Sequence, residues 1–272
     1  MTAGGGTLRF TVLGCGSSGG VPRIGRDGPN WGACDPANPR NRRRRCALLV
    51  ERIGPRGRTT VLVDAGPDVR TQLIDAGTGH LDAVVFTHDH ADHCHGIDDL
   101  RMVVFNRRAQ LPAYMDAKTE ATLMERFGYV FETPPGSDYP PILERHPIGT
   151  SVEVGGAGGM VALDPFEVPH GRPTALGFRI GPLAYLPDVS AMSEAAWQAV
   201  RGSEVWVLDA LRYTPHPSHA NLDTALGWIA ASGVPRAYLT NMHVDLDYAR
   251  VEAETPPHVH PAHDGLVLEF PA

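Results

Sequence analysis

The sequence has few cysteines and no long apolar run. Its 272 residues include four cysteines, which form neither a CxxC pair nor the spacing of a disulfide framework. The first ten residues, MTAGGGTLRF, lack the charged and apolar regions of a secretory signal peptide. No apolar run approaches the roughly 20 residues needed to cross a bilayer. These absences predict a cytoplasmic protein that does not insert into a membrane.

Basic residues are not in excess either. Lys and Arg together number 24 against 31 Asp and Glu, so the formal net charge is −7 and the pI is near 6.0. A dedicated nucleic-acid-binding protein normally carries an excess of Lys and Arg because it neutralises phosphates. The composition argues against that class. An anionic substrate must therefore be met by a local basic patch or by metal ions.

Short apolar runs bounded by Gly, Pro, Asn or Asp recur along the chain and are typical of strands. They are LRFTVL, CALLVE, TTVLVD, LDAVVF, MVALDPFEV, ALGFRI, LAYLPD, EVWVLD, RAYLTN and LVLEF. Helical patterns lie between some of them, at 67–77, 116–130 and 221–233, and Asn221 is the expected N-cap of the last. Strands outnumber helices, so the pattern predicts a layered α/β fold.

The turn-rich segment ETPPGSDYPP, residues 132–141, is expected to connect two halves of one domain. No internal repeat, low-complexity tract or change of composition marks a second domain. We therefore predict a single domain over residues 1–272.

The segment GCGSSG, residues 14–19, satisfies the dinucleotide-binding pattern GxGxxG after a predicted strand. It continues into GVPRIG, which cannot easily open the helix that this motif requires. We interpret it as a glycine turn that lets the backbone approach the site.

The stretch THDHADHCHG, residues 87–96, contains four histidines and two aspartates directly after a predicted strand. His88 and His90 are two residues apart in extended chain and project to the same side, whereas Asp92 and His93 require the chain to curl. Three imidazoles and a carboxylate this close are costly to desolvate without a cation. The pattern HxHxDH therefore predicts a metal site, from which His95 is left out.

This motif cannot fill two coordination spheres alone, so further ligands are expected at other strand ends. His170 follows PFEV, Asp188 ends LAYLPD and His243 follows RAYLT. Each stands where a predicted strand gives way to a loop. From there, all three can reach a shared sheet edge.

The arrangement resembles the metallo-β-lactamase superfamily, whose signature is HxHxDH followed by a distant His, an Asp and a final His. The resemblance covers nearly the whole chain and extends to LVDAG, where Asp64 looks like the family's buried acid. It implies a four-layer αβ/βα sandwich and two ions bridged by Asp188. The implied ligands are His88, His90 and His170 for one ion and Asp92, His93 and His243 for the other.

Two divalent ions roughly 3.5–4 Å apart share a hydroxide and neutralise charge on a phosphoryl group, which suits phosphodiester hydrolysis. Asp92 is accordingly assigned a catalytic role besides its role as a ligand. A mixed set of His and carboxylate ligands selects weakly among metals, and we favour zinc or manganese.

TVLGCGSSGGVP and RNRRRRCALLVE resemble the branch that contains the phosphonate-pathway phosphodiesterase for phosphoribosyl cyclic phosphate, with ribonuclease Z as a more distant relative. In that branch a histidine lies near the leaving group, and the matching stretch HANLDTAL begins with His219. We assign His219 as general acid or phosphate ligand, with His216 as its rival. The branch's cysteine-rich zinc loop is not matched, because Cys34 is the only cysteine there.

The run RNRRRR, residues 40–45, is interpreted as a solvated loop, although one or two of its arginines could clamp a terminal phosphate. Cys94, beside the ligand loop, is expected to be buried packing.

These observations predict a binuclear metal-dependent phosphodiesterase acting on a small cyclic phosphate or nucleotide-like diester. A tRNA 3′-processing endonuclease, a lactone or thioester hydrolase and a non-catalytic metal-binding protein are the alternatives. Nucleic acid is thus a less favoured partner, no membrane partner is expected and a homodimer is left open.

Overall fold

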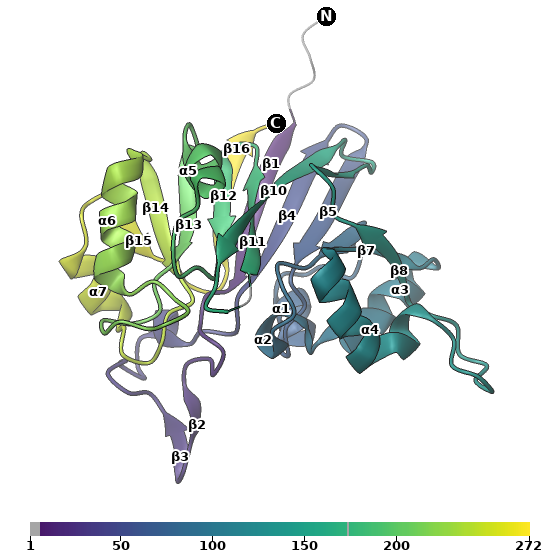
Figure 1. Cartoon of the computed structure of the whole chain (residues 1–272), viewed down its shortest axis with the longest axis horizontal. Helices are drawn as coiled ribbons and strands as arrows, with labels where there is room; N and C mark the ends of the chain where they lie inside the picture. Colours follow the sequence, from purple (N-terminus) through teal and green to yellow (C-terminus); the bar gives the residue numbers. More distant parts are fainter. Residues whose placement is uncertain (1–5, 173) are drawn as a thin grey trace, which may run out of the picture. The chain divides into compact units, whose positions relative to one another are not determined.

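The computed structural model describes residues 6–172 and 174–272. Its strands form two seven-stranded mixed sheets and a separate two-stranded hairpin (Figure 1). The first sheet has the order β16-β1-β4-β5-β6-β7-β8 and the second β15-β14-β13-β12-β11-β10-β9. The predicted α/β fold class is confirmed by these mixed sheets and the helices between their strands.

All ten predicted strands are present, but six more were missed. The first sheet comprises β1 (Thr7–Gly14), β4 (Ala47–Gly54), β5 (Gly57–Val63), β6 (Ala83–Val85), β7 (Leu111–Met115), β8 (Leu143–Pro147) and β16 (Leu266–Pro271). The second comprises β9 (Val152–Val154), β10 (Val161–Pro169), β11 (Thr174–Ile180), β12 (Leu183–Leu186), β13 (Val205–Asp209), β14 (Arg236–Thr240) and β15 (Val259–Pro261). The hairpin pairs β2 (Arg23–Gly25) with β3 (Gly28–Asn30).

The three predicted helices are confirmed. The helices are α1 (Val69–Asp75), α2 (Ala91–Cys94), α3 (Arg101–Arg107), α4 (Ala117–Phe131), α5 (Glu194–Val200), α6 (Leu222–Ser232) and α7 (Tyr248–Glu254). Asn221 caps α6 as predicted, because its side chain accepts a hydrogen bond from the Thr224 N–H at 3.2 Å. Gly233 ends this helix in the left-handed conformation.

Packing divides the chain into two compact units. The first takes the chain up to Leu13, Ala47–Ala162 and Val267–Ala272, and the second takes Gly14–Cys46 and Leu163–Leu266. Segment 132–141 lies inside the first unit, between α4 and β8, so the prediction that it connects two halves is wrong. The chain instead passes between the units near strand ends.

Parallel pairing sets where the loops of each unit gather. In the first unit β5, β6, β7 and β8 are parallel neighbours. In the second unit β12, β13, β14 and β15 are parallel neighbours. Because carboxyl ends of parallel strands meet at one sheet edge, the loops that follow them lie side by side. These loops carry the predicted ligands except His170, which follows β10.

The glycine turn after β1 does not open a helix, because the next element is the strand β2. This agrees with the rejection of the dinucleotide motif. A Cβ on Gly16 would lie 2.9 Å from the Arg43 carbonyl oxygen, so the close approach of these two backbones requires glycine.

None of the helices among the described residues has both the length and the apolar character needed to span a membrane.

Candidate metal centre

The first unit gathers four of the predicted ligands in one loop. His88 follows β6, His90 precedes α2, and the single turn of α2 carries Asp92 and His93. The His88 ring centroid lies 4.5 Å from that of His90 and 4.3 Å from that of His93. The extended chain between His88 and His90 and the helical turn that carries Asp92 and His93 are therefore both present, as predicted.

A buried carboxylate orients His93. Asp64 directly follows β5 and has φ of 67°, and its Oδ2 lies 2.7 Å from His93 Nδ1. The same carboxylate accepts hydrogen bonds from the N–H and the hydroxyl of Thr87, both at 2.8 Å. Burial raises the pKa of Asp64, and the contacts with His93 and Thr87 oppose that rise. Asp64 is thus buried beside the ligand loop, as expected.

This contact leaves Nε2 of His93 as the nitrogen that can bind a metal. Nε2 lies 3.5 Å from Asp92 Oδ2. Two ligands of one tetrahedral zinc, each about 2.0–2.1 Å from the ion, are about 3.4 Å apart. His93 and Asp92 therefore fit one shared ion.

The second unit places a further group at the ends of its strands. His170 follows β10, Asp188 follows β12, and His219 precedes α6. One ligand atom from each of these three residues lies within 4.8 Å of the others. The rings of His170 and His219 are 4.7 Å apart. Two of the three, His170 and Asp188, are predicted ligands, whereas His219 is predicted to be a general acid or a phosphate ligand.

Hydrogen bonds also orient the histidines of this unit. His170 Nδ1 lies 2.7 Å from the Ser218 carbonyl oxygen, so it donates its proton there. His243 Nδ1 lies 2.7 Å from Asp245 Oδ1. In each case an oxygen holds Nδ1 and Nε2 is the nitrogen available for a metal, as is usual for metal-binding histidines. The residues present therefore fit divalent ions.

Asp209 and Asn241 belong to this site but were missed from the sequence. Asp209 ends β13 and is fully buried, with Oδ2 2.9 Å from His219 Nδ1 and 3.1 Å from the Val189 N–H nitrogen. Asn241 Nδ2 donates to Asp188 Oδ1 at 2.7 Å and to Asp209 Oδ1 at 3.2 Å. Asp209 carried a readable signal, because it ends an apolar strand in EVWVLD as Asp188 does in LAYLPD.

His219 is held by two carboxylates. Burial lowers the pKa of its imidazole, but hydrogen bonds with Asp188 and Asp209 outweigh burial and raise the pKa to about 10. Burial raises the pKa of Asp209 to about 7, and His219 opposes that rise. These contacts favour the protonated form of the His219 ring. Its Nδ1 faces the carboxylates at 2.9 and 3.1 Å, which leaves Nε2–H to donate elsewhere.

His216, the rival acid, differs in its surroundings. Its ring centroid is 5.1 Å from that of His219, and its Nδ1 accepts a hydrogen bond from the Ser218 N–H at 3.3 Å. Burial lowers the pKa of His216, and the neighbouring charge of His219 lowers it further. Its surroundings thus favour the neutral form of His216, whereas the carboxylates favour the protonated form of His219, and this contrast favours His219 as the proton donor.

One arginine of the run 40–45 corrects the prediction of a solvated loop. Arg43 is 2% exposed, and its guanidinium donates to the Leu246 carbonyl at 2.7 Å and to the His243 carbonyl at 3.4 Å. The thiol of Cys34 donates to the Val244 and Leu246 carbonyls at 3.3 and 3.5 Å. Arg43 and Cys34 therefore hold the loop that carries His243.

Cys94 is fully buried, as predicted, and its thiol donates to the His90 carbonyl at 3.1 Å. Burial raises its pKa to about 12, which keeps it a thiol at neutral pH. His95 packs its ring against Phe127 of α4 at 5.2 Å.

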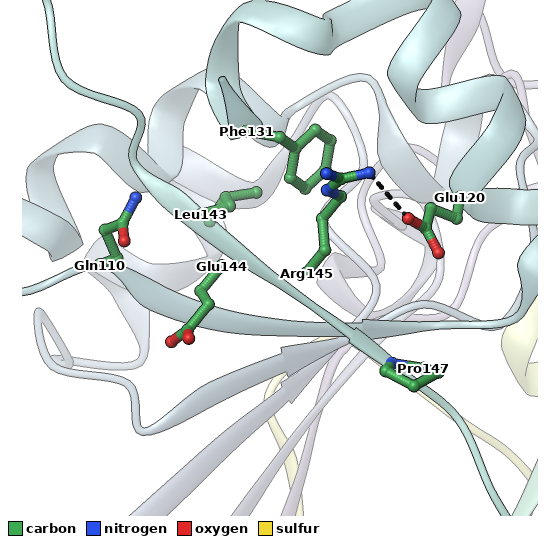
Figure 2. Close-up of a pocket in the computed structure, with 7 residues that line it drawn as sticks. All are labelled: Gln110, Glu120, Phe131, Leu143, Glu144, Arg145 and Pro147. Carbon is green, nitrogen blue, oxygen red and sulfur yellow. Dashed lines mark hydrogen bonds and ion pairs between the residues drawn. The ribbon is translucent and has the colours of Figure 1, made fainter. Parts of the chain in front are cut away.

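A pocket of about 500 Å³ in the first unit lies among α4, β8 and the start of β7 (Figure 2). Its Arg145 is paired with Glu120 at 2.9 Å and with Glu132 at 2.7 Å. The only cation among the described lining residues, Arg145, is thus already paired, the lining also carries the carboxylates of Glu120 and Glu144, and none of its residues is a predicted ligand.

Comparison with known proteins shows which family the chain resembles. The Beta-lactamase superfamily domain matches residues 59–242. A crystal structure described as a new diphosphatase from the PhnP family is 35% identical, with a TM-score of 0.86 over 97% of this chain and 98% of that chain. The short form of human tRNase Z is 15% identical, with a TM-score of 0.63 over 96% and 98% of the two chains.

Among curated proteins, one named octanoyltransferase from Porphyromonas gingivalis (strain ATCC BAA-308 / W83) is 32% identical over 264 residues. The match takes 95% of this chain but 51% of that protein. The chain thus spans about half the length of this relative.

Proposed function

The chain belongs to the Beta-lactamase superfamily, and we propose that it is a binuclear phosphodiesterase for a small cyclic phosphate or nucleotide-like diester. Family membership and the His and Asp clusters make it a metal-dependent hydrolase. The proposed part is that the bond cleaved is a phosphodiester. Its main support is the 35% identity, over nearly the full length of both chains, to a diphosphatase of the PhnP family.

The proposed ligands are those that the resemblance implies. His88, His90 and His170 bind one ion, Asp92, His93 and His243 bind the other, and Asp188 bridges the pair. When bound, such a pair lowers the pKa of coordinated water and offsets charge on a phosphoryl group. The metals are proposed to be zinc or manganese, because a mixed imidazole and carboxylate set suits both.

This chain's own residues supply orientation and a proton. Asp64, Ser218 and Asp245 fix His93, His170 and His243 through their Nδ1 atoms. Asp92 is proposed to assist the reaction from its place beside His93 Nε2. His219 holds a proton at Nε2, from which it is proposed to protonate the leaving oxygen.

Substrate profiling of the metal-loaded protein tests this function. We expect turnover of bis(p-nitrophenyl) phosphate and of nucleoside cyclic phosphates, and less than a hundredth of that rate on p-nitrophenyl acetate, a lactone and a thioester. The preference is expected because paired ions stabilise the charge of a phosphoryl transition state. Inertness toward every small phosphodiester, together with turnover of a carbon ester or of precursor tRNA, would refute the proposal.

A further inference from the structure

Asn241, the residue that follows β14, has φ of 58°, a left-handed conformation that few residues other than glycine adopt. The backbone is fixed on both sides of it. On one side, the Thr240 carbonyl accepts a hydrogen bond from the Ala210 N–H at 3.0 Å. On the other side, the Met242 N–H donates to the Cys15 carbonyl at 2.9 Å. These contacts hold Asn241 in a conformation of the kind that gathers at functional sites.

The side chain of Asn241 is buried between two carboxylates and an imidazole. It is 2% exposed, and its Nδ2 lies 2.7 Å from Asp188 Oδ1, 3.2 Å from Asp209 Oδ1 and 3.0 Å from His219 Nδ1. Ionised carboxylates only accept hydrogen bonds, so the NH₂ end of the amide, and not its oxygen, faces them. Each of the two N–H groups of the amide therefore has a carboxylate partner.

The same two carboxylates hold the imidazole of His219. Its Nδ1 lies 2.9 Å from Asp209 Oδ2 and 3.1 Å from Asp188 Oδ1. Asn241 contacts one oxygen of Asp209, and His219 contacts the other. Two carboxylates that share a buried site repel one another, and the amide and ring N–H groups between them offset this repulsion. Removal of the amide therefore leaves both carboxylates, and the imidazole that they hold, less fixed.

We propose that Asn241 is a positioning residue, which locks the two carboxylates around His219 Nδ1 so that the Nε2 end of the ring keeps one direction toward the leaving oxygen. The inference rests on the proposed phosphodiesterase function and adds to it a residue that acts through His219 rather than on the substrate. An imidazole that is held at one nitrogen presents the other in a fixed direction. All four residues of this network belong to the second unit.

Two substitutions separate the amide from the backbone that carries it. Asn241→Gly suits the left-handed conformation and removes the side chain, whereas Asn241→Asp keeps the shape and replaces the donor by an acceptor. Each is expected to lower kcat on nucleoside cyclic phosphates about tenfold or more with KM little changed, but turnover of bis(p-nitrophenyl) phosphate at most about threefold. Arg108→Gly is the matched control and should change neither rate, because Arg108 is exposed and also has a left-handed φ, of 57°.

A double substitution distinguishes positioning of His219 from a general loss of structure. In a His219→Ala protein, Asn241→Gly should cost less than about twofold more on cyclic phosphates, because the residue that it positions is already gone. A further tenfold loss in the double variant would overturn the positioning role. So would an equal loss for both substrates in the single Asn241 variants.

Nitrogen-15 NMR of the metal-free protein tests the network without any turnover. The His219 Nδ1 proton should be detected, because hydrogen bonds in a buried site slow its exchange with water, and loss of the signal in His219→Ala assigns it. We expect the signal to shift or vanish in both Asn241 variants and to persist in Arg108→Gly. Its absence from the wild-type protein, or its persistence unchanged in the Asn241 variants, contradicts the inference. The expected change without turnover of any diester refutes the proposed function alone.

Discussion

Asp188→Ala is expected to lose most metal binding and, with it, most turnover. The side chain is 2% exposed, and its Oδ1 lies 2.7 Å from Asn241 Nδ2 and 3.1 Å from His219 Nδ1. As the proposed bridge, it contributes to both ions. Loss of an outer-shell partner alone typically costs 10–100-fold in metal affinity, so loss of the bridge should cost more than about 100-fold.

Metal analysis after dialysis against a dilute chelator measures this effect. Asp164→Ala is the matched control, because Asp164 is exposed on β10 of the same unit. Thermal unfolding of the metal-free proteins shows whether the fold survives each change. An Asp188→Ala protein that keeps wild-type metal content and turnover would remove Asp188 from the ligand set.

His219→Ala is expected to keep its metal and lose about 10²–10⁴-fold in kcat, the usual contribution of a positioned acid. In the proposed role, Asp188 and Asp209 hold His219 at Nδ1 and the Nε2 proton passes to an alkoxide leaving group. A p-nitrophenolate leaves without such help. The loss should therefore be large for cyclic nucleotides and much smaller for bis(p-nitrophenyl) phosphate.

This dependence on the leaving group separates three roles for His219. A metal ligand, which its place beside His170 and Asp188 also allows, would lose metal on substitution. A phosphate ligand would lose turnover equally for both substrates. His216→Ala is the matched control. If that variant, and not His219→Ala, shows a loss of turnover that depends on the leaving group, His216 is the general acid.

Sequence patterns were sufficient to predict features that depend on neighbouring residues, such as the ends of a helix. Asn221 and Gly233 bound α6 because an amide cap and a left-handed glycine act within one turn of the helix. The strands β7 and β8 were missed because Pro112 in one and three polar residues in the other interrupt the apolar run. Their place in the sheet comes from neighbours far along the chain.

The ligand loop could be predicted because its residues are contiguous and its geometry is local. Asp209 shares with Asp188 the signal of an acid at the end of an apolar strand, but its contacts with His219 and Asn241, which give it a role in the site, are not visible in the sequence. Arg43 was misjudged for a related reason. Its charge suggested solvent, but carbonyls of the loop at 243–246, some 200 residues away, supply its hydrogen bonds.

The most direct measurement of the central claim is turnover of bis(p-nitrophenyl) phosphate as zinc or manganese is added to the metal-free protein. Paired ions predict that turnover is absent without metal, rises with added ion and reaches its plateau at two ions per chain. A plateau at one ion per chain, or two ions bound with no turnover, would contradict a binuclear phosphodiesterase.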